Sequence, residues 1–228
     1  MKKVILPLFC ILMGVTSVTA QKKTAAPAKI ETQNAKLSAK DVIDTYIKAL
    51  GGKDKLEAVK TTIIHNTLSV QGMEISMVTK KLGNKFRSEQ EVMGQKMVQF
   101  FDGEKGYIEQ MGQKIDIPAT EIDDLKKAKV IDALGYDPAK FSEVNVEKVD
   151  GKDYNVLTSE QGKSYFDKST GLLHKTISED NKIFINNYMT IEGIKFPSEV
   201  EAEGNGQKVL IKTTKVIINS GVSEEDFK

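Results

Sequence analysis

Short β-prone runs separated by turns, most of which contain glycine, fill most of this 228-residue chain. The turns follow one another at Gln71-Gly72, Gly83-Asn84, Gly94, Asp102-Gly103 and Met111-Gly112, and again at Asp150-Gly151, Gln161-Gly162, Thr170-Gly171, Asp180-Asn181, Glu192-Gly193 and Gly204-Asn205-Gly206. Closely spaced turns of this chemistry connect neighbouring antiparallel strands. The spacing therefore predicts an antiparallel meander of roughly a dozen strands.

Alternation within these runs predicts which face of the sheet is buried. Met73, Ile75 and Met77 point to one side of their strand, while Glu74 and Ser76 point to the other. The same alternation places Phe86 with Val92, Ile183 with Ile185, Met189 and Ile191, and Ile194 with Phe196, Val200 and Ala202. One face is thus expected to be apolar and the other charged. A sheet of this kind must cover its apolar face with helices or with a ligand.

The last strand changes its apolar phase. Val209 and Ile211 set one phase, and Val216 and Ile218 set the other. An extra residue in one strand produces such a shift, so we expect a β-bulge at Thr213-Thr214.

Two helical segments interrupt the strand pattern. The first begins at Ser38, where Asp41 has capping-box spacing, and it ends at Gly51-Gly52. Its apolar positions, Val42, Ile43, Tyr46, Ile47 and Leu50, recur at helical intervals, and a short turn of helix through Leu56 and Val59 follows. The second begins at Thr120 and stops at Gly135 and Pro138, with one stripe formed by Ile122, Leu125, Ile131 and Leu134. We expect it to cover the sheet or to lie across its open edge.

Residues 1–20 have the features of a signal peptide. Lys2 and Lys3 precede an apolar run, Val4 to Val15, that is too short to span a bilayer as an anchor. Small residues before Gln21 predict cleavage after Ala20 and export to the periplasm. Residues 21–37 lack periodicity and are expected to be a flexible leader, which leaves 38–228 as one domain. Cys10, the only cysteine, lies within the signal, so we expect neither a disulfide nor a lipid anchor.

The composition argues against nucleic acid as a partner. Lys and Arg total 33 against 32 Asp and Glu, a net charge of +1. Proteins that bind nucleic acid concentrate basic residues, and this chain has no such excess.

Few residues could carry catalysis. His65 and His174 are the only histidines, and they fall on separate predicted strands. No ligand spacing for zinc, phosphate loop or nucleophile motif is present. The sequence predicts a protein that is not an enzyme and uses no cofactor or metal.

Methionine is unevenly distributed. Five of the six that follow the predicted signal lie in one stretch: Met73, Met77, Met93, Met97 and Met111. The flexible thioether suits surfaces that bind variable apolar partners, and it also fills protein cores well. Both interpretations stay open on sequence alone.

The order of several motifs resembles the outer-membrane lipoprotein-sorting family, the LolA-like carriers. These motifs are the helix Asp41 to Gly52, Gly83-Asn84-Lys85-Phe86-Arg87, Phe101 to Tyr107, Tyr165 to Leu173, Gly193-Ile194-Lys195-Phe196-Pro197, and the segment from Ile217 to Phe227. The resemblance covers roughly residues 38–228. It implies an α+β fold, mostly antiparallel β, in which an incomplete, half-open β-barrel has helices over its concave side. It also implies a cavity there that holds acyl chains.

One departure from the family concerns an arginine. The carriers place a functional arginine just before the turn that precedes the Phe strand, whereas this chain has Lys80-Lys81-Leu82. The difference favours a less specialised relative over a dedicated lipoprotein carrier.

Two hypotheses of function follow. The first is a periplasmic binding protein for lipid or lipidated protein, without a transmembrane segment in the mature chain. Its predicted apolar contacts are Met73, Ile75, Met77, Phe86, Met97, Phe101, Ile183 and Ile185. The second is an envelope accessory or sensing module that binds a protein partner through its sheet. A cavity of several hundred Å³ beneath the helices favours the first, and a filled space favours the second.

Overall fold

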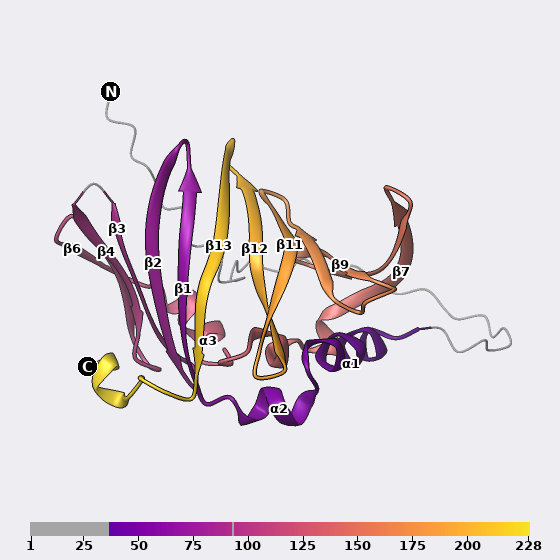
Figure 1. Ribbon diagram of the computed structural model, residues 1–228, viewed down its shortest axis with the longest axis horizontal. Coiled ribbons are helices and arrows are strands. Elements are labelled where there is room, and N and C mark those ends of the chain that lie inside the picture. Colours follow the sequence, from indigo (N-terminus) through magenta and orange to yellow (C-terminus); the bar gives the residue numbers. More distant parts are fainter. Residues whose placement is uncertain (1–36, 93) are drawn as a thin grey trace, which may run out of the picture.

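The computed structural model describes residues 37–92 and 94–228, which form one antiparallel sheet of 13 strands with short helices (Figure 1). The predicted signal peptide, the leader up to residue 36 and Met93 lie outside the described residues. The antiparallel meander predicted from the turns is confirmed. Within the described part of the chain, no helix is long and apolar enough to cross a membrane.

The strands divide into two runs separated by the mid-chain helices. The first run is β1 (Thr61–Val70), β2 (Met73–Leu82), β3 (Lys85–Val92), β4 (Gln95–Phe101), β5 (Gly106–Gln110) and β6 (Gln113–Asp116). The second run is β7 (Phe141–Val149), β8 (Lys152–Ser159), β9 (Gly162–Asp167), β10 (Leu173–Ile177), β11 (Asn181–Ile191), β12 (Ile194–Gly204) and β13 (Gln207–Ile218).

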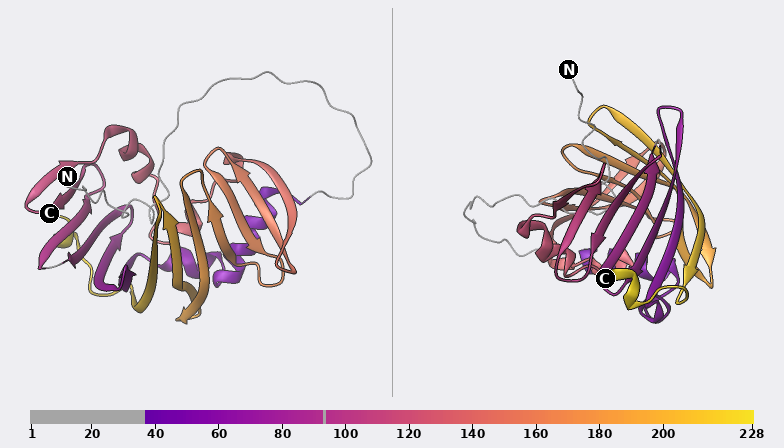
Figure 2. Two further views of the ribbon diagram at one scale, coloured as in Figure 1. Left: turned by 90° about the horizontal axis from the view of Figure 1, so that it is seen from above. Right: turned by 90° about the vertical axis from the view of Figure 1, so that its left-hand side faces the viewer.

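The path of the chain explains why the sheet stays open. The chain starts at β1 in the middle, steps outward hairpin by hairpin to the edge strand β6, and crosses to the opposite edge strand β7. It then steps back until β13 pairs with β1. Since β6 and β7 do not pair, the sheet is an incomplete barrel that curves around the crossing segment (Figure 2).

The first helix forms as its sequence predicts. α1 (Ala39–Leu50) has Ser38 at its N-cap, and the Ser38 backbone N–H donates to the Asp41 carboxylate at 2.9 Å in a full capping box. Gly51, with φ of 137°, ends the helix, and α2 (Lys53–Ala58) follows. The helices lie along one end of the strands (Figure 1).

The single mid-chain helix predicted from Thr120 is wrong in extent. The structure has three short pieces: α3 (Ala119–Leu125), η2 (Asp132–Gly135) and η3 (Pro138–Lys140). Leu125 packs beside Phe86 of β3, whereas Ile131 packs into the cluster around α1. Six residues of continuous helix span only about 9 Å, so an extended stretch between the two positions lets the chain cross from one cluster to the other.

We call the side of the sheet that α1 and α3 cover the inner face. Residues directly opposite in an antiparallel ladder share a face, so the register assigns every strand position. Ile64 pairs with Val216 and packs in the α1 cluster. The predicted bulge is confirmed: His65 pairs with Lys215 and Asn66 with Thr213, which leaves Thr214 as the extra residue. The bulge keeps both apolar phases of β13 on the inner face.

The outer face is less uniformly charged than the alternation predicts. Arg87 and Glu89 form an ion pair there at 2.6 Å, as expected for a charged surface. The C-terminal turn η4 (Glu224–Phe227) nevertheless covers part of this face, where Phe227 packs with Val98 and Phe100. A second small outer cluster contains Tyr154, Val156 and Tyr165.

Candidate ligand-binding face

One apolar cluster on the inner face consists of strand residues alone. Its members come from β1, β2, β11, β12 and β13: Leu68, Met77, Val200, Val209 and Ile211 are buried, and Val70, Ile75, Ile183 and Ile185 are half-buried around them. The register brings them together, since Leu68 pairs with both Ile75 and Ile211. We call this set the strand-only cluster.

The helices cover the neighbouring part of the inner face. Tyr46 and Leu50 of α1 and Leu56 of α2 pack with strand residues such as Phe166 in the largest cluster of the molecule. The Tyr46 ring meets the Phe166 ring edge-on at 5.3 Å between centroids. The space beneath α1 and α2 is therefore filled by the side chains of the protein itself.

Buried phenols within this helix-covered region are structural. Burial raises the pKa of Tyr136 to about 12, so its hydroxyl is protonated at neutral pH. The Tyr188 hydroxyl donates to the Leu173 carbonyl oxygen at 2.7 Å, and burial raises its pKa well above the usual range. Neither group is poised to act as a base.

Six of the eight predicted contact residues lie together on the inner face. Met77, Ile75, Ile183 and Ile185 belong to the strand-only cluster. Met73 pairs with Val70 of that cluster and is 41% exposed. Met97 stands beyond Gln90 in the cross-strand row that begins at Met77.

The other two predicted residues, Phe86 and Phe101, face the same side but are packed under α3. Their ring centroids lie 6.0 Å apart, and Ile117 and Leu125 close over them. Phe101 is fully buried. Alternation identifies the face of a strand residue and carries no information on which element covers it.

The methionine stretch does not act as one group in space. Met77 is buried in the strand-only cluster, whereas Met111 occupies a hairpin turn with φ of 53° and is 69% exposed. Met93 lies outside the described residues.

A group of polar residues on the inner face was missed by reasoning from sequence. Thr79, Ser88, Gln90 and Gln99 are buried beside the strand-only cluster. Ser88 and Gln90 stand in the same alternation phase as Phe86, which is the signal that could have identified them.

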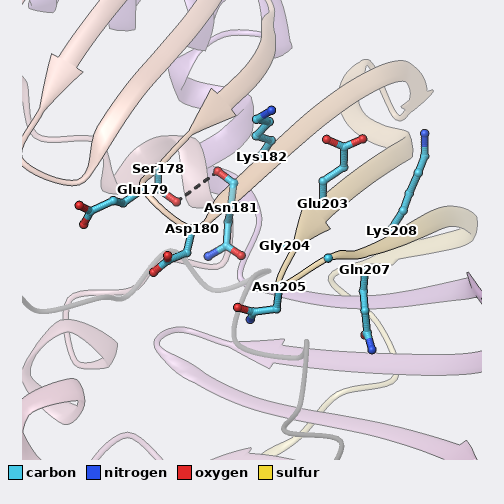
Figure 3. Close-up of a pocket in the computed structure, with 11 residues that line it drawn as sticks. Ser178, Glu179, Asp180, Asn181, Lys182, Glu203, Gly204, Asn205, Gln207 and Lys208 are labelled. Atoms are coloured by element: carbon cyan, nitrogen blue, oxygen red, sulfur yellow. Dashed lines mark hydrogen bonds between the residues drawn. The ribbon is translucent and has the colours of Figure 1, made fainter.

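A pocket of about 380 Å³ lies away from this region, at the tips of two hairpins (Figure 3). Its lining residues are polar, charged or glycine and come from the turns between β10 and β11 and between β12 and β13, including Ser178, Asp180, Asn181 and Lys208. None of the eight predicted contact residues lines it. This pocket is not the apolar cavity that the resemblance implied.

The two histidines lie apart in the described part of the chain. His65 of β1 and His174 of β10 are four strands apart in the sheet, about 19 Å at the usual strand spacing. Burial lowers the pKa of His174, so its imidazole is neutral at pH 7. Across residues 37–92 and 94–228, no three His, Cys, Asp or Glu side chains gather as metal ligands.

Two lysines occupy the stretch in which the LolA-like carriers have an arginine, and their side chains lie on opposite faces of the sheet. Lys80 forms an ion pair with Asp226 on the outer face. Lys81 lies on the inner face and reaches Asp132 of η2 at 2.8 Å.

Solved structures of other proteins share the fold of this chain. No protein-family profile matches the chain, and no curated protein sequence matches it. Among solved structures, a DUF1329 family protein from Desulfovibrio piger superposes with a TM-score of 0.54 at 14% identity, over 83% of this chain and 97% of that one. A domain assigned to the outer membrane lipoprotein-sorting proteins of Vibrio parahaemolyticus gives 0.55 at 10% identity, with coverages of 83% and 97%. A LolA superfamily protein from Nitrosomonas europaea gives 0.52 at 12% identity, with coverages of 85% and 98%. The chain is thus LolA-like in fold, an incomplete antiparallel barrel with helices over one face.

Proposed function

We propose that this protein is a non-enzymatic periplasmic carrier that binds the acyl chains of a lipid or a lipidated protein on the strand-only cluster. The observation that carries the proposal is the composition of that cluster, in which no described helix takes part. The proposed contacts are Met73, Ile75, Met77, Met97, Ile183 and Ile185. Export through a cleaved N-terminal signal is part of the same proposal.

Apolar burial alone can supply the affinity. Each methylene moved from water to an apolar surface contributes roughly 0.8 kcal/mol. Burial of an acyl chain can therefore drive binding without any charged partner. The half-buried residues Ile75 and Ile183 offer the surface that such a chain would cover, and Ile185 adjoins them while also packing against the cluster around α1.

Fatty-acid binding by the delipidated protein tests the proposal. The protein is purified after expression of the full chain and is examined by native mass spectrometry before and after addition of laurate or palmitate. A variant with Ile75→Gln and Ile185→Gln should bind at least about tenfold more weakly, because buried amides oppose the acyl chain. Val78→Gln, on the outer face of the same strand as Ile75, is the matched control. Equal binding by both variants, or no binding by the parent protein, contradicts the proposal.

The alternative function is an envelope accessory or sensing module that binds a protein partner through its sheet. The packing beneath α1 and α2 favours it, because side chains from the helices and the strands form one buried cluster there. Under this alternative the Ile75 and Ile185 substitutions change no lipid binding, because the parent protein binds none.

A further inference from the structure

Beside the strand-only cluster, the inner face carries a strip of buried polar side chains. Thr79 of β2 pairs with Ser88 of β3, and Ser88 pairs with Gln99 of β4. Gln90 stands in the next row, between Met77 and Met97. Because opposite residues share a face, all four point to the side on which the acyl chain is proposed to lie.

Two amides of the strip lack a complete set of hydrogen bonds within the described structure. Gln90 and Gln99 are 8% and 7% exposed, and the Oε1 atom of each has no partner there. Among the described residues, the Gln90 Nε2 donates to the Met97 sulfur at 3.5 Å, and a thioether is a weak acceptor. Thr79 and Ser88, by contrast, bond each other at 2.7 Å.

An unpartnered buried acceptor is costly, so its retention calls for an explanation. Leaving such an oxygen without a donor costs about 1–3 kcal/mol, whereas an apolar residue of similar shape would cost nothing there. A bound molecule that presents O–H or N–H groups to the two amides would remove the penalty.

The strip adjoins the apolar surface directly. Met77 of the strand-only cluster is two residues from Thr79 along β2 and directly opposite Gln90. Residues two apart on a strand stand about 7 Å from each other. A molecule with an acyl chain and a polar head could therefore lie with its chain on the cluster and its head on the strip.

The strip is also uncharged. Its cross-strand neighbours on the inner face include Ile64, Asn66, Met97 and Ile108. Lys81, the neighbour of Thr79 on that face, forms an ion pair with Asp132 at 2.8 Å. A carboxylate or phosphate would find no free cation on the strip and could not donate to the two amide oxygens.

We infer that Gln90 and Gln99 select acyl ligands with an uncharged head that carries hydroxyl or amide donors, such as an acylglycerol. This inference rests on the proposed function, since it assumes that acyl chains bind the neighbouring cluster. Gln90 and Gln99 determine specificity by accepting hydrogen bonds from the head.

Two uncharged esters of one chain length test the inference. 1-Monolauroylglycerol carries two hydroxyls, and methyl laurate carries none. Displacement of the fluorescent probe 1-N-phenylnaphthylamine measures both affinities. The parent protein should bind the glycerol ester at least about fivefold more tightly, the effect of one typical hydrogen bond. The double variant Gln90→Leu, Gln99→Leu should lose this preference, with methyl laurate binding unchanged.

The controls separate this inference from the proposed function. Gln161→Leu, in the exposed turn between β8 and β9, should keep the preference. Thermal unfolding checks that the double variant folds. If the double variant does not fold, the relative affinity of the parent protein for the two esters still tests the inference. Equal binding of both esters by the parent, or an undiminished preference in the folded double variant, overturns the inference alone. Binding of neither ester overturns the proposed function as well.

Discussion

At Gly162 the backbone has φ of 133°, and a Cβ atom there would lie 2.0 Å from the Ile177 carbonyl oxygen. Gly72, in the hairpin between β1 and β2, also has positive φ, at 83°, but nothing lies within 4 Å of the position a Cβ would occupy. The two glycines share a conformational requirement, and only Gly162 has a packing requirement as well.

This contrast gives a prediction about two alanine substitutions. Gly72→Ala should lower the free energy of unfolding by about 1 kcal/mol, the strain of a left-handed alanine. Gly162→Ala adds a clash with backbone that must move, so it should lower the free energy by more than about 3 kcal/mol. Urea unfolding of the two variants measures both values, and equal losses would refute the packing argument.

Phe101 supplies a second prediction at the residue scale. Its ring is fully buried between Phe86 and the residues of α3, so Phe101→Ala should cost about 3–5 kcal/mol of unfolding free energy. Met73, on the same face but 41% exposed, is the control, and Met73→Ala should stay within about 0.5 kcal/mol. A small loss at Phe101 in the same denaturant titration would mean that α3 does not close over it.

Among the elements, α1 depends on its capping box and on its apolar stripe. The stripe residues Val42, Ile43, Tyr46 and Leu50 are all buried against the inner face. The Ser38 side chain accepts from the Asp41 backbone N–H, and the Asp41 carboxylate accepts from Ser38 in return. The sequence shows both features because they depend only on residue type and spacing.

The third prediction concerns Ser38, the N-cap residue of α1. Ser38→Ala removes one half of the capping box and should cost about 1 kcal/mol, while Ser38→Asp keeps an acceptor at the N-cap and should restore most of it. Thermal unfolding followed by circular dichroism measures the order of the three proteins. An aspartate variant no more stable than the alanine variant would show that the cap contributes nothing.

On the scale of the whole molecule, the C-terminal turn η4 packs on the outer face of the first run of strands. Phe227 packs beside Val98 and Phe100, and Asp226 forms an ion pair with Lys80 of β2. The hydrogen bond from Lys80 holds the pKa of Asp226 below its ordinary value of 3.8. A depressed carboxyl pKa contributes stability that is present above 3.8 and is lost as the pH falls through the folded-state value.

This linkage gives the fourth prediction. Asp226→Asn should be less stable than the parent at pH 7, and the difference between them should shrink as the pH falls below about 3.8. Denaturant unfolding of both proteins from pH 7 to pH 2.5 follows the difference. Glu179→Gln, at an exposed hairpin position, is the control and should track the parent. A difference that stays constant with pH would exclude the ion pair as its cause.

The sequence alone determined the local features of this protein. The hairpin turns, the α1 cap, the inward phase of the apolar residues and the bulge at Thr214 follow from residue chemistry and from the period of a strand. Only the tertiary structure decided what covers each part of the inner face. It placed Phe86 and Phe101 under α3, left the strand-only cluster without a helix, broke the mid-chain helix at the crossing, and buried Gln90 and Gln99. Coverage depends on contacts between segments far apart in the chain, and periodicity within one segment carries no information about them.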